Sequence, residues 1–154
     1  MNNSTAAPGD DIDMASLMTP PVARAAGSLS LLSGIITALT SLQTISITSI
    51  RGALAAAPYV LLLLGSATAF AGGKLLGGHG RAAIAATALN GVMFFACGAW
   101  LVISLMGGLF SLFAFIDPGL ALLAGVVAAV SIAPCGKVTA ARKEGEQAGF
   151  GLGI

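Results

Sequence analysis

The sequence predicts an all-α integral membrane protein, a four-helix (tetraspan) bundle with both termini in the cytoplasm. Of its 154 residues, 56% are hydrophobic and 8% are charged, whereas a soluble domain carries about 25% charged residues. Four apolar runs each approach the roughly 20 residues that a helix needs to cross a bilayer. They cover about residues 25–47, 58–76, 82–106 and 118–135. The runs lack the period-2 alternation of a membrane β-barrel, so helices are expected.

These runs divide the chain into three segments. Residues 1–24 form a polar, acidic N-terminal tail, residues 25–136 form the four-helix transmembrane domain, and residues 137–154 form a C-terminal tail. No basic residue precedes Arg24, so the first run does not resemble a cleaved signal peptide and should remain as a helix.

Lysine and arginine gather on one side of the predicted bundle. Six of them lie in the two tails and around the loop between the second and third helices, whereas Arg51 lies on the other side. Because basic residues favour the cytoplasmic side, both tails and this loop are expected there. The protein would then lie in the inner (cytoplasmic) membrane if it is bacterial. The six residues are Arg24, Lys74, Arg81, Lys137, Arg142 and Lys143.

Several function classes are disfavoured by composition. The net charge is only +1 and no basic stripe alternates with aromatic residues, so nucleic-acid binding is not expected. The single histidine, His79, has no second ligand near it for a metal, and paired haem ligands are absent. The acidic residues are expected in the tails or at the membrane surface, so no ionisable group is expected within the four spans. We therefore predict no enzymatic activity, no cofactor and no metal.

The first apolar run carries an unusual row of hydroxyl groups. Nine serines and threonines lie between Leu29 and Ile50, and at 100° per residue seven of them fall within an arc of about 100°. Bonds to the carbonyl three or four residues back would satisfy each hydroxyl without any alignment. The alignment therefore predicts a face turned toward other helices or toward water. Its members are Ser30, Ser33, Thr37, Thr40, Ser41, Thr44 and Thr48.

Two other helices carry small residues at every fourth position. Such rows allow helix backbones to approach closely in a membrane, although they also arise by chance in a chain with 21 glycines. We interpret them as helix-packing faces. They comprise Gly65, Ala69, Gly73 and Gly77 in the second helix, and Ala121, Gly125, Ala129 and Ala133 in the fourth.

Two side-chain amides, Asn90 and Gln43, fall within the predicted spans. An unpaired amide in lipid costs several kcal/mol, so each should find a partner. Gln43 lies off the hydroxyl row, which suggests contact with another subunit or with the outer headgroup layer. The two cysteines, Cys97 and Cys135, lie at different depths and are expected to remain free.

The segment between the third and fourth helices combines a helix-start signal with phenylalanines. Asp117 followed by Pro118 is typical of a helix N-terminus, which predicts that the fourth helix begins at 118 with Asp117 at the membrane surface. Residues 107–116 either extend the third helix, the preferred interpretation, or lie in the interface as a partner surface. Their aromatic members are Phe110, Phe113 and Phe115.

Two functions fit these patterns. The first is a non-catalytic protein that acts by helix packing, as a scaffold, as an accessory subunit of a membrane complex or as a homo-oligomer. The alternative is a weakly selective pore or facilitator, in which the hydroxyl faces of several first helices line a water path. The expected partners are the lipid bilayer and other membrane subunits or copies of the chain itself.

Overall fold

The computed structural model describes residues 19–47, 53–106 and 112–150, with side chains for 19–46, 55–106 and 115–144. Four long helices make up this part of the chain, namely α2 (Pro21–Ile47), α3 (Ala57–Leu76), α4 (Gly80–Met106) and α5 (Leu112–Phe150); a short 3-10 helix, η1 (Ala53–Ala56), precedes α3. Each long helix contains a stretch long and apolar enough to cross a membrane. The predicted fold class, an all-α membrane bundle of four helices, is confirmed, and the orientation of the termini stays a prediction.

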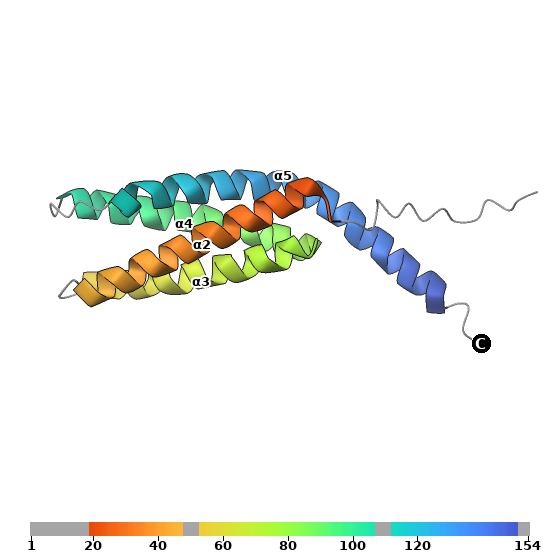
Figure 1. Cartoon of the computed structure of the whole chain (residues 1–154), viewed down its shortest axis with the longest axis horizontal. Helices are drawn as coiled ribbons and strands as arrows, with labels where there is room; N and C mark the ends of the chain where they lie inside the picture. The colour runs from red at the N-terminus through yellow and green to blue at the C-terminus, as the bar shows by residue number, and fades with distance from the viewer. Residues whose placement is uncertain (1–18, 48–52, 107–111, 151–154) are drawn as a thin grey trace, which may run out of the picture.

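The four helices are arranged as two antiparallel pairs. α2 packs most extensively on α3, and α4 packs on α5; the pairs join where α2 meets α5 and α3 meets α4. Figure 1 shows the pairs crossing near the start of α2 and diverging toward its end. We call the end with Pro21, Leu76 and Gly80 the tail end, and the end with Ser46, Ala57 and Met106 the far end.

Large apolar side chains point outward, and small ones fill the interior. Phe95 is 75% exposed and Leu63 is 72% exposed, and many other leucines and valines also lie on the outside. The interior side chains are mostly alanines, such as Ala26, Ala83 and Ala128. In lipid, burying a leucine against protein brings little gain over burying it among acyl chains, so close approach of small residues holds helices together instead. The bundle therefore contacts lipid over most of its outer surface.

α2 and α3 touch at two pairs of glycines. A Cβ added at Gly72 would lie 2.8 Å from the carbonyl oxygen of Gly27, and one added at Gly65 would lie 2.8 Å from that of Gly34. Real Cβ atoms do not approach other atoms so closely. Within each helix the two glycines are seven residues apart, which returns them to almost the same face because two helical turns take about 7.2 residues. The glycines thus bring the two backbones into direct contact.

The predicted four-residue rows do not stay at the helix interfaces. Gly65 is buried and Ala69 half-buried, but Gly73 and Gly77 are exposed. A step of four residues turns the helix by 400°, so the row drifts by about 40° per step and leaves the contact after two steps.

The row on α5 deviates in the same way. Gly125 is half-buried, and a Cβ there would lie 3.3 Å from Asn90 Cβ. Ala129 is exposed, whereas Ala124 and Ala128 are buried. The prediction that these rows form continuous packing faces is therefore wrong for their later members.

The predicted start of the fourth helix is also wrong. α5 begins at Leu112 and continues through Asp117 and Pro118, so residues 112–116 belong to α5 and do not extend the third helix, which ends at Met106. Residues 107–111, including Phe110, lie outside the described part. Phe113 falls within α5, and the side chain of Phe115 is 48% exposed on it.

α5 also continues beyond the predicted end of the membrane domain, through Pro134 to Phe150. Figure 1 shows this C-terminal part pointing away from the bundle. A proline inside a helix removes one backbone hydrogen bond and is a common cause of a kink. Much of the predicted C-terminal tail is thus helical.

The glycine contact predicts the effect of a single methyl group. Gly34→Ala would place a Cβ 2.9 Å from Ala69 Cα, against backbone atoms that cannot move aside easily. We expect a loss of about 1 to 3 kcal/mol in the free energy of unfolding, measured by SDS titration in mixed micelles with far-UV circular dichroism. Gly119→Ala is the control, because nothing lies within 4 Å of a Cβ there. Equal stability of the two variants would contradict the close contact.

Candidate functional site

The hydroxyl face of α2 points into the bundle. Among its described members, Ser30, Ser33, Thr37 and Ser41 are buried and Thr40 and Thr44 are half-buried, whereas Thr48 lies outside the described residues. On the opposite face of α2, Leu39 is 60% exposed, with Leu32 and Leu42 also exposed. The neighbours that cover the hydroxyls come from the same chain.

One hydroxyl of this face bonds to the buried amide of α4. Asn90 Nδ2 donates to Ser30 Oγ at 3.0 Å and to the Ala86 carbonyl at 2.8 Å. Both Asn90 and Ser30 are fully buried. The expectation that Asn90 finds a partner is confirmed, and the bond connects two helices that share few other contacts. Gln43, the other amide, is exposed on the outside of α2.

Most other hydroxyls on α2 donate to their own helix. Thr40, Ser41 and Thr44 each bond to the carbonyl four residues back, at 2.9, 2.6 and 2.8 Å. A hydroxyl that donates in this way still has oxygen lone pairs that can accept hydrogen bonds. These three hydroxyls are therefore satisfied as donors and can still accept a hydrogen bond from a donor outside the helix.

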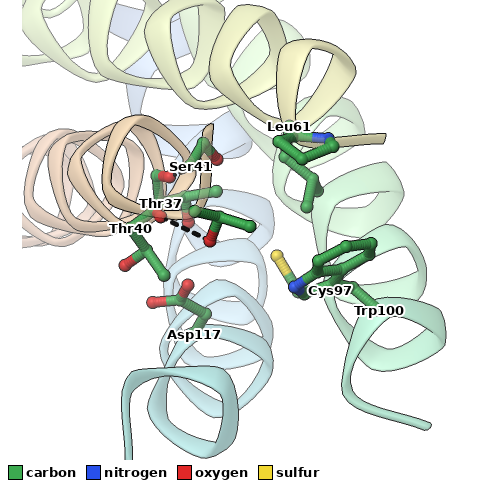
Figure 2. Close-up of a pocket in the computed structure, with 9 residues that line it drawn as sticks. Thr37, Thr40, Ser41, Leu61, Cys97, Trp100 and Asp117 are labelled. Carbon is green, nitrogen blue, oxygen red and sulfur yellow. Dashed lines mark hydrogen bonds between the residues drawn. The ribbon is translucent and has the colours of Figure 1, made fainter. Parts of the chain in front are cut away.

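A carboxyl group lies opposite this face. Asp117 of α5 is 6% exposed and sits beside Thr37 and Thr40 of α2 and Cys97 of α4 (Figure 2). Figure 2 shows the carboxyl pointing toward the two threonines and the Cys97 sulfur pointing toward Thr37. Residues from all four long helices surround a small space of about 10 Å³, roughly the room that one water molecule needs. The full lining is Thr37, Thr40, Ser41, Thr44, Pro58, Leu61, Cys97, Trp100 and Asp117.

The prediction that Asp117 caps the start of the fourth helix is wrong. Asp117 lies five residues after Leu112, the first residue of α5, or about 8 Å along the helix at 1.5 Å per residue. Its side chain is buried between helices, and its level relative to the membrane surface stays a prediction. The hydroxyls of α2 give the carboxyl polar surroundings inside the bundle. A buried carboxyl among membrane-spanning helices is costly and commonly marks a functional site.

Four buried oxygens near this face have no hydrogen-bond partner within the described residues. They are Ser33 Oγ, Thr37 Oγ1, Asn90 Oδ1 and Asp117 Oδ1. Each unsatisfied buried group costs about 1 to 3 kcal/mol. Together with Ser30 they form a row that runs from Asn90 and Ser30 at one end to Asp117 at the other. The distance along α2 from Ser30 to Thr40, which lies beside Asp117, is about 15 Å. We call this set the polar row.

The polar row can hold a proton or a small polar molecule, but it has little else for chemistry. Both cysteines are free and buried, as expected. His79 lies in the turn between α3 and α4 at the tail end, whereas Cys97 and Asp117 line the space between the far ends of the helices. Among the described residues, no group of three His, Cys, Asp or Glu side chains could hold a metal.

The residues that sequence reasoning missed are Asp117 and Cys97. A signal for Asp117 was present, because the five residues before it, Leu112 to Ile116, are all apolar and a charged residue in such a run is unusual. The aligned hydroxyls were a second signal, since they require a polar partner.

Comparison with protein-family models, with curated proteins and with solved structures finds no match to this chain. The function is therefore argued from the geometry of the bundle.

The bond between Ser30 and Asn90 predicts a measurable coupling. In a double-mutant cycle of Ser30→Ala and Asn90→Ala, we expect the two changes to be non-additive by about 0.6 to 1.7 kcal/mol, as for other interhelical bonds in membranes. The readout is the free energy of unfolding in mixed micelles. Ser28→Ala is the matched control, because its exposed hydroxyl bonds to Arg24 of its own helix. Additivity within about 0.3 kcal/mol for the Ser30 pair would contradict the bond.

Proposed function

We propose that this multi-pass membrane protein has no catalytic activity and acts by binding another membrane helix, as an accessory subunit, a scaffold or a homo-oligomer. The observation that carries this proposal is an unfilled pair of glycines on the outer face of α4. A Cβ added at Gly91 or at Gly98 would meet nothing within 4 Å. Both glycines are half-buried, and each leaves an open notch in the surface of α4 where a side chain would otherwise stand.

The spacing of these glycines supports helix binding. Gly91 and Gly98 are seven residues apart, as are the glycines that bring α2 and α3 into backbone contact. In lipid, such notches favour association because they allow helix backbones to approach closely. Gly91 and Gly98 thus repeat the glycine spacing of the α2–α3 contact, and no atom of the described chain lies within 4 Å of the positions where their Cβ atoms would be.

An aromatic side chain lies between the two notches. Phe95 is the most exposed side chain of those on α4 between the glycines, at 75%, and its ring packs edge-on against Phe94 at 5.3 Å. Phe95 falls on the same side as Gly91 and Gly98, within about 40° to 60° at 100° per residue. A projecting ring beside notches is complementary to a second copy of the same face, so we expect a homo-oligomer or a closely similar partner.

The position of the hydroxyl face also favours packing over a pore built from several chains. Ser30, Ser33 and Thr37 are covered by helices of their own chain. A water path shared by the first helices of several copies would require these hydroxyls on the outside. The burial of these hydroxyls within one bundle supports a structural role for the hydroxyl face of α2.

The absence of catalysis is a proposal supported by the placement of the reactive groups. The imidazole of His79 lies in the α3–α4 turn, and the Cys97 thiol and the Asp117 carboxyl lie near the far end. A cysteine nucleophile is usually activated by a histidine base within hydrogen-bond reach, and here a bundle length separates the His79 imidazole from the Cys97 thiol.

The notches give a specific prediction for oligomer size. In Gly91→Leu/Gly98→Leu, two bulky side chains would block the approach of a second helix, and their Cβ atoms would meet nothing within 4 Å in the described chain. We expect the assembly seen for the native protein to dissociate to the single chain, measured by native mass spectrometry from a mild detergent. Circular dichroism should show unchanged helix content.

Gly119→Leu is the matched control, because Gly119 lies in equally open space on α5. This variant should assemble as the native protein does. A native protein that is monomeric and carries no partner under these conditions would contradict the proposal, as would an assembly that survives both leucines.

A second candidate function comes from the polar row. Oxygens without partners at Ser33, Thr37 and Asp117 are typical of a path along which water or a proton moves, because polar groups in a membrane mark such paths. This path would lie within one chain. It replaces the shared pore as the alternative to packing.

This alternative predicts proton leakage that depends on one carboxyl group. Liposomes with the native protein should dissipate a pH gradient faster than empty liposomes, and Asp117→Leu should abolish the difference, because it removes the only carboxyl that lines the 10 Å³ space. Ser46→Ala, an exposed hydroxyl bonded to its own helix, is the control and should leak like the native protein. Vesicles that remain tight with the native protein would exclude this function.

A further inference from the structure

A second, larger hollow lies between α3 and α4 at the tail end. It is an open groove of about 530 Å³, within the range of small-molecule sites, about 300 to 1,000 Å³. α3 and α4 share the smallest interface of the four neighbouring helix pairs. Alanines face each other there and leave the space between the helices unfilled. The apolar walls are Ala67, Phe70 and Ala71 of α3 with Ala82, Ala85 and Leu89 of α4.

The tail end of this groove is basic. Lys74, His79 and Arg81 line it, and all three are exposed. Lys74 Nζ lies 5.6 Å from the centre of the Phe70 ring, so the ammonium stands above the apolar wall. No ion pair is recorded for Lys74 or Arg81 within the part of the chain that the structure describes. The charge at this end of the groove is thus not neutralised by the described residues.

The start of α4 adds to this positive charge. A helix N-terminus carries a partial positive charge and favours an anion, yet the first turn of α4 contains Arg81 and no acidic residue. Placing a cation there is unfavourable unless an anion lies close by. Arg81 and the N-terminus of α4 therefore both favour a negatively charged group at this position.

The extension of α5 holds the basic turn in place. Thr139 Oγ1 accepts a hydrogen bond from the Gly80 amide at 3.3 Å, and Arg142 Nη1 donates to the Gly77 carbonyl at 3.3 Å. Gly78 has a φ of 75°, a conformation that favours glycine. These contacts fix the α3–α4 turn and bring a further cation to it.

We propose that this groove binds an anionic phospholipid, with the phosphate between Lys74 and Arg81 and an acyl chain along the alanine walls. A soluble anion would use the basic end but not the apolar walls, and a neutral lipid would use the walls but not the charges. Phe70 is 69% exposed at the edge of the groove, where it faces lipid in a membrane. Basic pockets between transmembrane helices commonly bind anionic headgroups. This site goes beyond the proposed function and does not depend on it.

The test compares two lipids that differ only in headgroup. The full chain is purified in detergent and titrated with dioleoyl phosphatidylglycerol or with dioleoyl phosphatidylcholine, and native mass spectrometry measures the Kd of the first bound lipid. We expect the anionic lipid to bind about tenfold more tightly, because each nearby Lys or Arg contributes severalfold. Glycerol 3-phosphate tests the headgroup alone and should bind far more weakly.

Three variants separate the charges from the walls. Lys74→Gln/Arg81→Gln should bring the two lipids within about twofold of each other. Arg24→Gln/Lys137→Gln removes two exposed charges that do not line the groove, and it should keep the preference. Ala67→Leu/Ala85→Leu fills the groove from exposed positions and should weaken binding of the anionic lipid at least tenfold.

The proposal is overturned if the native protein binds both lipids equally, or if glycerol 3-phosphate binds as tightly as the anionic lipid. It is also overturned if the preference survives loss of Lys74 and Arg81, if the control pair removes the preference equally, or if filling the groove has no effect.

Discussion

Lipid neither drives helices together nor offers hydrogen bonds, and this constraint governs the whole bundle. The helices must be held by direct contact between backbones and by polar groups that find partners inside. Gly27 with Gly72 and Gly34 with Gly65 provide the first kind of contact between α2 and α3. Ser30 with Asn90 provides the second between α2 and α4. α2 makes both kinds, which is why its sequence combines glycines, hydroxyls and leucines on three different faces.

The same helix connects packing with the candidate site. The hydroxyl face that bonds Asn90 continues along α2 to Thr37 and Thr40, where it meets Asp117. A carboxyl is tolerated inside the bundle because the hydroxyl oxygens and a space of about 10 Å³ surround it. A substitution on the hydroxyl face can therefore change both the packing of α2 and the surroundings of the Asp117 carboxyl. At one end of the polar row Ser30 connects two helices, and at the other end Thr37 faces the carboxyl.

Much of the fold could be predicted from the sequence, because span length and mean apolarity are local properties. The inward direction of Ser30, Ser33 and Thr37 also followed from a single helix, since 100° per residue fixes which side chains share a face. Contacts between helices could not be obtained in this way. Gly65 and Gly73 look equivalent in the sequence, but only Gly65 lies against the α2 backbone; a Cβ at Gly73 would meet only the Leu31 side chain, at 3.8 Å. This difference depends on where the neighbouring helix crosses.

Asp117 illustrates the limit most clearly. Asp-Pro is a local signal for a helix start, and the local signal was misleading because α5 begins earlier, at Leu112. The hydroxyls that accommodate the carboxyl are some 80 residues away in the chain, at Thr37 and Thr40. Nothing near Asp117 in the sequence announces them. The groove between α3 and α4 was missed for a related reason, since its walls are mostly alanines, which carry no individual signal.

The distribution of side-chain size has a consequence for how this protein tolerates variation. In a soluble domain the bulky residues are the constrained ones, because they fill the core. Here the bulky residues contact acyl chains, which adapt to any apolar shape, so exchanging Leu63 for isoleucine or Val92 for leucine alters little. The constrained residues are instead the glycines at the α2–α3 contact, because a Cβ there would meet the backbone of the neighbouring helix. The usual relation between volume and constraint is inverted there, and a family descended from this chain would diverge fastest at its leucines while keeping the glycines of the α2–α3 contact.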